Sequence, residues 1–166
     1  IGWFQGRFEW GPRALGNRSI IADPRRKEMK DVVNTKIKFR EPFRPFAPSV
    51  LADNVHDYFD VSSSSSVMLE DFMLSVIPVK ESRGNEISAV NHMGTARIQR
   101  VKEESNILYY NLIKKFFEVT GVPMLLNTSF NVRGEPIVNS PGDAINTFKK
   151  SGIDTLVLGN FIVDKN

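Results

Sequence analysis

Apolar residues recur three and four positions apart in one long stretch between Ser105 and Thr120. This spacing predicts an amphipathic helix that is capped by the Ser105 hydroxyl and ends at Gly121, because glycine readily adopts the left-handed conformation found at helix ends. The apolar face of this helix is expected to comprise Leu108, Leu112, Ile113, Phe116, Phe117 and Val119.

The rest of the chain alternates between short apolar runs, which predict strands, and helical or turn-forming segments. Downstream of the helix we expect a strand at 123–126, a polar loop at 127–131, a strand after Gly134, a helix from Ser140 to Gly152, and strands at 155–158 and 161–163. Upstream we expect a helix at 29–36 and strands at 46–51, 72–79 and 96–101. The serine tract at 62–66 predicts a mobile surface loop within a flexible insertion near residues 60–70.

This order of elements predicts an α/β fold in which helices flank one twisted, mixed β-sheet. The 166 residues, 41% of them hydrophobic, suffice for one ordinary core, so we expect a single domain over residues 1–166. The chain contains no cysteine, which excludes a disulfide framework, a thiol nucleophile and a thiolate metal site.

The start of the chain lacks both an initial methionine and the basic residues of a signal peptide. No apolar run approaches the roughly 20 residues that cross a bilayer. We therefore expect a soluble, cytoplasmic protein without membrane association. We also expect the chain to be a fragment of a longer one.

The net charge is +3, and the basic residues are unevenly distributed. Eleven of the 22 lysines and arginines lie within residues 1–44, against five acidic residues there. This asymmetry predicts an anionic partner near the first quarter of the chain. For Arg25, Arg26, Lys27 and Lys30 the favoured interpretation is instead the solvated surface of a helix.

Two triplets place polar side chains on either side of a phenylalanine. Lys38 and Arg40 flank one such residue, and Ser129 and Asn131 flank another. In extended backbone, residues two positions apart point to the same side. The cations of the first triplet are suited to hold phosphate, and the hydroxyl and amide of the second to fix a planar amide-like group. We expect both triplets to face one cavity.

Two further arginines stand among rigid or turn-forming residues. Prolines and phenylalanines surround Arg44 and are expected to confine it, so its charge needs an anionic ligand or a salt bridge to Glu41 or Asp53. Arg97 follows a predicted turn at Gly94, at the start of a strand. Its position fits either phosphate binding or an ordinary exposed strand arginine.

The segment 6–19 contains three glycines and three arginines. Glycine allows backbone to approach a ligand closely, and a short helix beginning at Pro12 would offer free amides to phosphate. The alternative is a structural turn in which Glu9 pairs with Arg13 or Arg7. The segment lacks the Gly-Lys-Ser or Gly-Lys-Thr ending of a Walker loop.

Four motifs connect these residues to a known family. They are GRFEWGPRALGNRS at 6–19, KFREPFRPFAPS at 38–49, GTAR at 94–97 and LNTSFNVRGEPIV at 126–138. In this order they resemble the carboxy-terminal domain of O-carbamoyltransferases, which include nodulation-factor and antibiotic carbamoyltransferases. The resemblance spans essentially the whole chain. It departs from the family pattern at Asn91 and Met93, where a histidine and an acidic residue are expected.

The resemblance implies a YrdC-like fold with a concave basic cavity, as in threonylcarbamoyladenylate synthases. It implies that this domain converts carbamoyl phosphate and ATP, with Mg²⁺ carried by the ATP phosphates, to carbamoyladenylate. A preceding transfer domain would then pass the carbamoyl group to an acceptor hydroxyl. The expected catalytic residues are Lys38, Arg40, Ser129 and Asn131. The expected substrate contacts are Arg13, Arg44, Arg97, Asn127 and Thr128.

Chemistry of this kind depends on charge neutralisation and alignment, so it needs neither a catalytic cysteine nor paired carboxylates. The two histidines, His56 and His92, lack metal-ligand spacing, and we expect no metal held by protein ligands. Two other interpretations stay open: an RNA-binding module and a regulatory nucleotide-binding domain without turnover. Nucleic acid is the less favoured partner, because the distinctive arginines stand among prolines and glycines. Homodimer formation also stays open.

Overall fold

The computed structural model describes residues 1–61 and 67–165, so the predicted mobile serine loop lies outside the described residues. The described chain forms a mixed α/β fold, as the sequence predicts, around a seven-stranded sheet of order β6-β3-β7-β2-β1-β8-β9. Its strands are β1 (Gly2–Phe4), β2 (Arg18–Ala22), β3 (Ala47–Leu51), β6 (Gln99–Val101), β7 (Met124–Ser129), β8 (Thr155–Leu158) and β9 (Phe161–Asp164).

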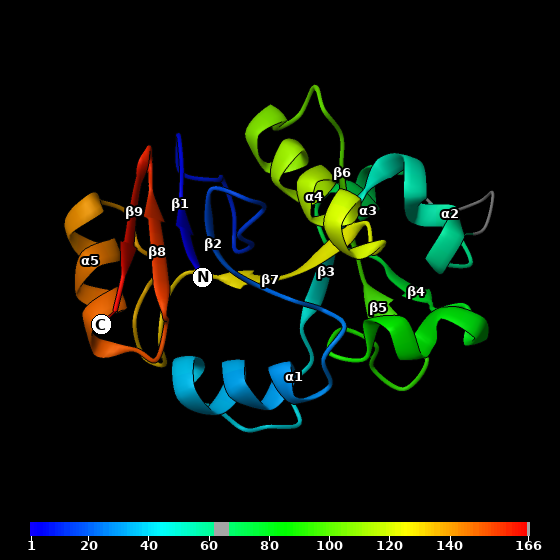
Figure 1. The fold of residues 1–166 in the computed structure, drawn as a ribbon, viewed down its shortest axis with the longest axis horizontal. Coiled ribbons are helices and arrows are strands. Elements are labelled where there is room, and N and C mark those ends of the chain that lie inside the picture. The colour runs from blue at the N-terminus through cyan, green and yellow to red at the C-terminus, as the bar shows by residue number, and fades with distance from the viewer. Residues whose placement is uncertain (62–66, 166) are drawn as a thin grey trace.

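The sheet is mixed because two of its strand pairs run parallel. These are β1 with β8 and β3 with β6, whereas the other neighbours are antiparallel. A separate antiparallel pair consists of β4 (Val76–Pro78) and β5 (Thr95–Arg97). This pair lies beyond the β3–β6 end of the large sheet, on the right in Figure 1.

Helices lie on both sides of the sheet (Figure 1). Helix α4 (Ile107–Thr120) covers one face, and α1 (Glu28–Val32) with its π-helical continuation Val33–Lys38 lies on the other. Helix α5 (Pro141–Lys150) packs beside β1 and β8. The short helical segments are Ala52–Asn54, α2 (Val55–Tyr58), α3 (Val67–Asp71) and Glu81–Ile87.

Alternation along the strands divides the apolar core between the two faces. Ile20 and Leu126 join the core beneath α1 and α5, whereas their chain neighbours Ile21 and Leu125 join the core under α4. All four are buried. Because burying each such side chain contributes about 1.5–3 kcal/mol, a register shift of one residue in β2 or β7 is strongly disfavoured.

The two longest predicted helices form. Helix α4 ends at Gly121 with φ 75°, as expected, but its cap is Asn106, whose side chain accepts from the Tyr109 amide at 3.1 Å. Ser105 instead donates its hydroxyl to a backbone carbonyl. Helix α5 begins at Ser140 with a complete capping box.

The helix predicted at 29–36 is divided into α1 and the π-helix Val33–Lys38. The buried Asn34 side chain explains the changed ending, because it binds the loop that follows. Its Nδ2 donates to the carbonyls of Pro42 at 3.3 Å and Arg44 at 3.1 Å. Phe39 then adopts a left-handed conformation with φ 49° and ends the helix.

Three strand predictions are wrong in detail. The strand expected at 72–79 is shortened to β4, because Met73 has φ 56° and the chain turns there. The strand expected at 96–101 is interrupted at Ile98, where the chain passes from β5 in one sheet to β6 in the other. The strand expected after Gly134 does not form in the described residues; Pro136 lacks an N–H to donate.

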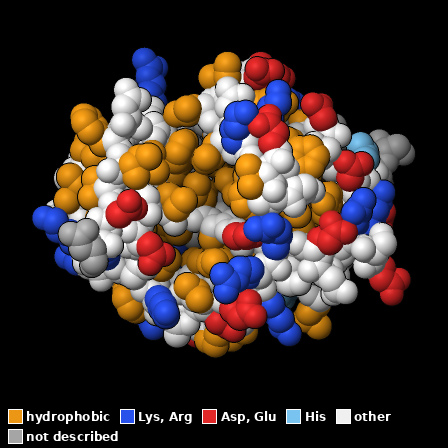
Figure 2. Space-filling view, viewed as in Figure 1, with side chains coloured by type: hydrophobic (Ala, Val, Ile, Leu, Met, Phe, Trp, Pro, Cys, Tyr) orange, Lys and Arg blue, Asp and Glu red, His pale blue; other side chains and the backbone are white. Residues whose placement is uncertain are grey.

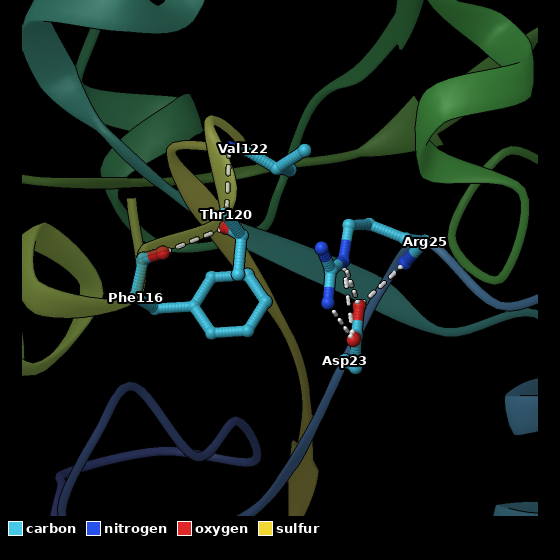
Figure 3. Close-up of polar contacts among 5 residues, drawn as sticks. All are labelled: Asp23, Arg25, Phe116, Thr120 and Val122. Carbon is cyan, nitrogen blue, oxygen red and sulfur yellow. Dashed lines mark hydrogen bonds and ion pairs between the residues drawn. The ribbon is translucent and has the colours of Figure 1, made fainter. Parts of the chain in front are cut away.

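The loop after β2 is fastened to the end of α4 (Figure 3). Arg25 donates to both Asp23 oxygens, from Nε at 2.9 Å and from a terminal nitrogen at 2.6 Å, and its guanidinium lies 5.5 Å from the Phe116 ring. The Thr120 hydroxyl donates to the Phe116 carbonyl at 2.6 Å and accepts from the Val122 amide. Arg25 therefore lies before the start of α1 and pairs with Asp23, so it is not part of a solvated helix surface.

Candidate active site

Strand β7, which lies between β3 and β2 inside the sheet, ends in polar residues. Asn127, Thr128 and Ser129 lie on the strand, paired with β2 and, for Asn127, also with β3, and not in the predicted loop. Phe130 is fully buried, as expected, and anchors the strand end in the core. Ser129 and Asn131 on either side of it remain partly exposed.

Lys38 contacts both polar residues of this strand end. Its Nζ lies 2.6 Å from the Ser129 carbonyl, 3.2 Å from Ser129 Oγ, 2.9 Å from the Asn131 carbonyl and 2.6 Å from Asn131 Oδ1. The side chain is 5% exposed and none of these partners is charged. Burial, together with the neighbouring charge of Arg40, lowers the pKa of Lys38 to about 7.

The segment that carries Lys38 and Arg40 is not extended, contrary to the prediction. Phe39 between them is left-handed and half exposed, so it does not pack into the core. The two cations nevertheless reach one cavity of about 260 Å³, which Ser129 and Asn131 also line. The structure thus brings together the four residues predicted to be catalytic.

A second cavity of about 110 Å³ shares Arg40 and Ser129 with the first. Arg13 and Arg97 also line it, although they are 84 residues apart in the chain. Among the described residues, none that lines this cavity is acidic, and none of the three arginines forms a salt bridge. The cavity therefore concentrates hydrogen-bond donors and positive charge.

The electrostatics of these arginines favour an anion. Burial lowers the pKa of Arg97, and the charge of Arg13 lowers it further. Burial and the charge of Arg44 act in the same direction on the pKa of Arg40. The Nε groups of Arg13 and Arg97 are buried without a hydrogen-bond partner in the described structure. An anion in the cavity would relieve the mutual repulsion and satisfy these donors.

Arg44 is not confined by apolar residues as predicted. Its side chain is 53% exposed, and its Nε lies 2.9 Å from a Glu41 carboxylate oxygen, which is one of the two salt bridges considered from the sequence. Phe43 beside it points into solvent, and only Phe46 is buried. Arg44 and Lys38 both line the cavity of about 260 Å³. Its contact with substrate stays a prediction.

Residues 6–17 are irregular and lead into β2, and the helix expected at Pro12 does not form there. Glu9 does not pair with an arginine here; its Oε1 accepts from the backbone amides of Leu15 at 2.8 Å, Asn17 at 2.7 Å and Arg18 at 3.3 Å. These three amides are thus satisfied within the protein and are not free to bind phosphate. The segment contributes the Arg13 side chain to the cavity instead.

Sequence reasoning missed Arg18, which is buried. Its guanidinium donates to the carbonyls of Gln5 at 2.6 Å, Asn17 at 3.0 Å and Gly6 at 3.2 Å, and it lies 3.6 Å from the centroid of the Phe4 ring. These contacts hold the glycine-rich segment against β1. The three arginines of this segment look alike in the sequence, and only the tertiary structure separates Arg18 from Arg13.

A larger cavity, of about 560 Å³, lies between residues 135–139 and α5, beside Phe8. None of the predicted site residues lines it.

No group of three His, Cys, Asp or Glu in the described ranges is arranged to hold a metal ion. Within those ranges, too, no helix has the length and apolar character needed to span a membrane.

Comparisons with known proteins identify the family of this chain. Residues 1–165 match the family described as carbamoyltransferase C-terminus. The chain belongs to this family. It is 50% identical to nodulation protein NolNO of Sinorhizobium fredii, with 99% of the chain and 24% of that protein covered. It is 36% identical to the 3'-hydroxymethylcephem-O-carbamoyltransferase of Amycolatopsis lactamdurans, with 96% of the chain and 29% of that enzyme covered.

The chain thus spans less than a third of the length of these two relatives. An uncharacterized Synechocystis protein, sll1178, is 48% identical and is covered over 29% of its length.

At the departure from the family pattern, Met93 is exposed in a left-handed turn with φ 52°. Asn91 accepts from the Gly94 amide at 2.9 Å, so it shapes the turn that leads to Arg97.

Proposed function

We propose that this chain forms carbamoyladenylate from carbamoyl phosphate and ATP, as one part of an O-carbamoyltransferase. The observation that carries the proposal is the cavity lined by Arg13, Arg40 and Arg97 without a carboxylate. Guanidinium groups bind phosphate oxygens bidentately and stay charged at neutral pH. Family membership supports carbamoyl chemistry, and we assign the donor and the nucleotide to the two adjoining cavities.

The reaction divides into two balanced steps. Water first cleaves carbamoyl phosphate into carbamate and inorganic phosphate. A carbamate oxygen then attacks the α-phosphorus of ATP; a new O–P bond forms as the bond to the β-phosphate oxygen breaks, and pyrophosphate leaves. Negative charge spreads over the phosphoryl oxygens in the second step, so its main requirement is neutralisation and alignment. We assign that role to Arg13, Arg40 and Arg97.

Lys38 is assigned a related role at the strand end. Its Nζ orients both Ser129 and Asn131 through their carbonyls and side chains. An incoming anion would stabilise the ammonium form and so raise the pKa of Lys38 above its ligand-free value. Mg²⁺ is proposed to arrive on the ATP phosphates, which it binds with few protein ligands.

Exchange of labelled pyrophosphate into ATP tests the proposal. The exchange should require carbamoyl phosphate, because only the reversal of carbamoyladenylate formation returns label to ATP. Arg97→Met should reduce it at least tenfold, since one charge-assisted phosphate contact is lost. Arg83→Met is the matched control, because Arg83 pairs with Glu86 on the surface away from both cavities. An exchange rate that is the same with and without carbamoyl phosphate would refute the proposal.

Transfer to an acceptor hydroxyl is proposed to need the remainder of the longer enzyme. Neither cavity is lined by a histidine. The cavity of about 260 Å³ contains the Glu41 carboxylate, but this group is paired with Arg44. If no acceptor is held in line beside a base, the barrier to transfer lacks the reduction of roughly 7–11 kcal/mol that alignment can provide. The 166-residue chain, given ATP, Mg²⁺, carbamoyl phosphate and hydroxylated acceptors, should release AMP without carbamoylated product by mass spectrometry. Product at the rate of the longer enzyme would contradict this division.

An RNA-binding role is less well supported. Such a module would spread cations over a broad face with aromatics for stacking. On the face shown in Figure 2, acidic side chains alternate with basic ones, and apolar side chains gather in the hollow between α4 and the β8–β9 end of the sheet. Three cations without salt bridges in the described structure, Arg13, Arg40 and Arg97, instead line one small cavity.

A further inference from the structure

Arg40 lines both cavities of the candidate site, and its guanidinium is held at one edge and over one face. Its Nε donates to Asn34 Oδ1 at 2.7 Å, and the guanidinium carbon lies 4.7 Å from the centroid of the Phe46 ring. In the described part of the chain, Nε is the one atom of this side chain that donates a hydrogen bond to protein. The two terminal nitrogens are therefore available to a ligand.

The partner of Nε, Asn34, is 0% exposed and lies in the π-helix Val33–Lys38. Its Nδ2 donates to the carbonyls of Pro42 and Arg44, which can only accept, so Oδ1 is the atom that faces the Arg40 guanidinium. The Asn34 carbonyl also accepts from the Arg40 amide at 3.0 Å. Asn34 thus holds both the main chain and the side chain of Arg40.

The neutrality of this acceptor matters for the charge of the site. The smaller cavity, which Arg40 shares with Arg13 and Arg97, has no acidic residue among its described lining residues. A carboxylate at position 34 would pair with the Arg40 guanidinium and compete with an anionic ligand for it. An amide oxygen fixes the direction of the guanidinium without neutralising it.

We infer that Asn34 is a positioning residue, which orients the Arg40 guanidinium toward phosphate oxygens and leaves its positive charge available to them. Asn34 lines neither cavity, so it acts through Arg40 and does not touch the ligand. An arginine that is ordered before the ligand arrives loses less side-chain entropy on binding. The inference rests on the proposed function, which supplies the phosphate groups of the ligand.

Titration calorimetry of the chain with inorganic pyrophosphate, at constant ionic strength, tests the inference in a double-mutant cycle. Arg40→Met should weaken binding at least about tenfold, and Asn34→Ala about 5- to 20-fold. When Arg40→Met is already present, adding Asn34→Ala should change the affinity by less than about twofold, because the effect of Asn34 passes through the arginine. A merely structural role would weaken binding equally in both backgrounds.

Two further variants complete the design. Asn34→Asp should weaken binding at least as much as Asn34→Ala, since its carboxylate competes with pyrophosphate for Arg40. Ser151→Ala is the control for loss of a buried hydrogen bond: Ser151 is 6% exposed and lines neither cavity, so the affinity should stay within about twofold of the wild type. Thermal melts establish that each variant is folded.

The outcomes separate this inference from the proposed function. Equal weakening by Asn34→Ala in both backgrounds, or wild-type affinity in Asn34→Ala or Asn34→Asp, would overturn the role of Asn34 alone. A wild-type chain that does not bind pyrophosphate, or an Arg40→Met variant that binds it unchanged, would overturn the role of Arg40 in the proposed function as well.

A measurement on the ligand-free wild type decides the matter if the Asn34 variants do not fold. In NMR spectra the Nε–H signal of Arg40, identified by its loss in Arg40→Met, should exchange with water roughly tenfold more slowly than that of the exposed Arg26. Equal exchange rates would show that the guanidinium is not held before the ligand binds, and the inference would fail.

Discussion

Replacing Lys38 with methionine should change how stability depends on pH. The pKa of this lysine falls from 10.5 to about 7 on folding, chiefly through burial. Between those two values the unfolded chain binds a proton that the folded chain has lost, so the free energy of unfolding rises with pH. The methionine variant has a similar volume and lacks this proton, and it should not show that part of the rise.

The magnitude follows from the two pKa values. Raising the pH from 7 to 9 should increase the free energy of unfolding of the wild type by about 2 kcal/mol more than that of Lys38→Met. Solvent screening reduces this little, because Lys38 is almost fully buried. Burial also lowers the pKa of the amino group of Ile1, but this group is present in both proteins and its effect cancels in the difference.

Urea unfolding at pH 7, 8 and 9 and constant ionic strength, followed by tryptophan fluorescence, measures the difference. Urea is preferable to guanidinium chloride because it does not screen charges. Parallel pH profiles for the two proteins would refute the reasoning. They would mean that the four oxygens around Nζ keep Lys38 charged in the folded state despite its burial.

Further substitutions test the supports of the site. Gly16→Ala should destabilise the fold by more than about 3 kcal/mol in thermal melts, because Gly16 has φ 112° and a Cβ would lie 2.3 Å from the Tyr109 ring. Gly11→Ala, at φ 115° with no atom within 4 Å of the added Cβ, should cost only about 1–2 kcal/mol; equal losses would refute the steric account. Ser140→Ala should cost about 1 kcal/mol in urea unfolding by removing the cap of α5, and no loss would contradict that role. Arg44→Lys should change stability by less than about 1 kcal/mol, because its ion pair is exposed; a larger loss would show that the pair is structurally important.

The sequence alone determined the family and much of the framework. Helical spacing located α4 and α5, whose ends carry local signals such as Ser140 and Gly121, and short apolar runs located β3, β8 and β9. The motifs also predict that Lys38, Arg40, Ser129 and Asn131 face one cavity, as they do in the structure.

Tertiary structure decided how those residues meet and which charges are free. Arg13 and Arg97 reach one cavity only because the glycine-rich segment and β5 converge at the end of β7, and no local pattern specifies that approach. The sequence also could not predict the exposure of Arg44. Its proline and phenylalanine neighbours indicate a confined side chain, whereas in the structure it lies in solvent beside Glu41. The orientation of the Asn127 side chain depends on the Ala14 carbonyl, 113 residues away in sequence, and this hydrogen bond forms only once the sheet is assembled.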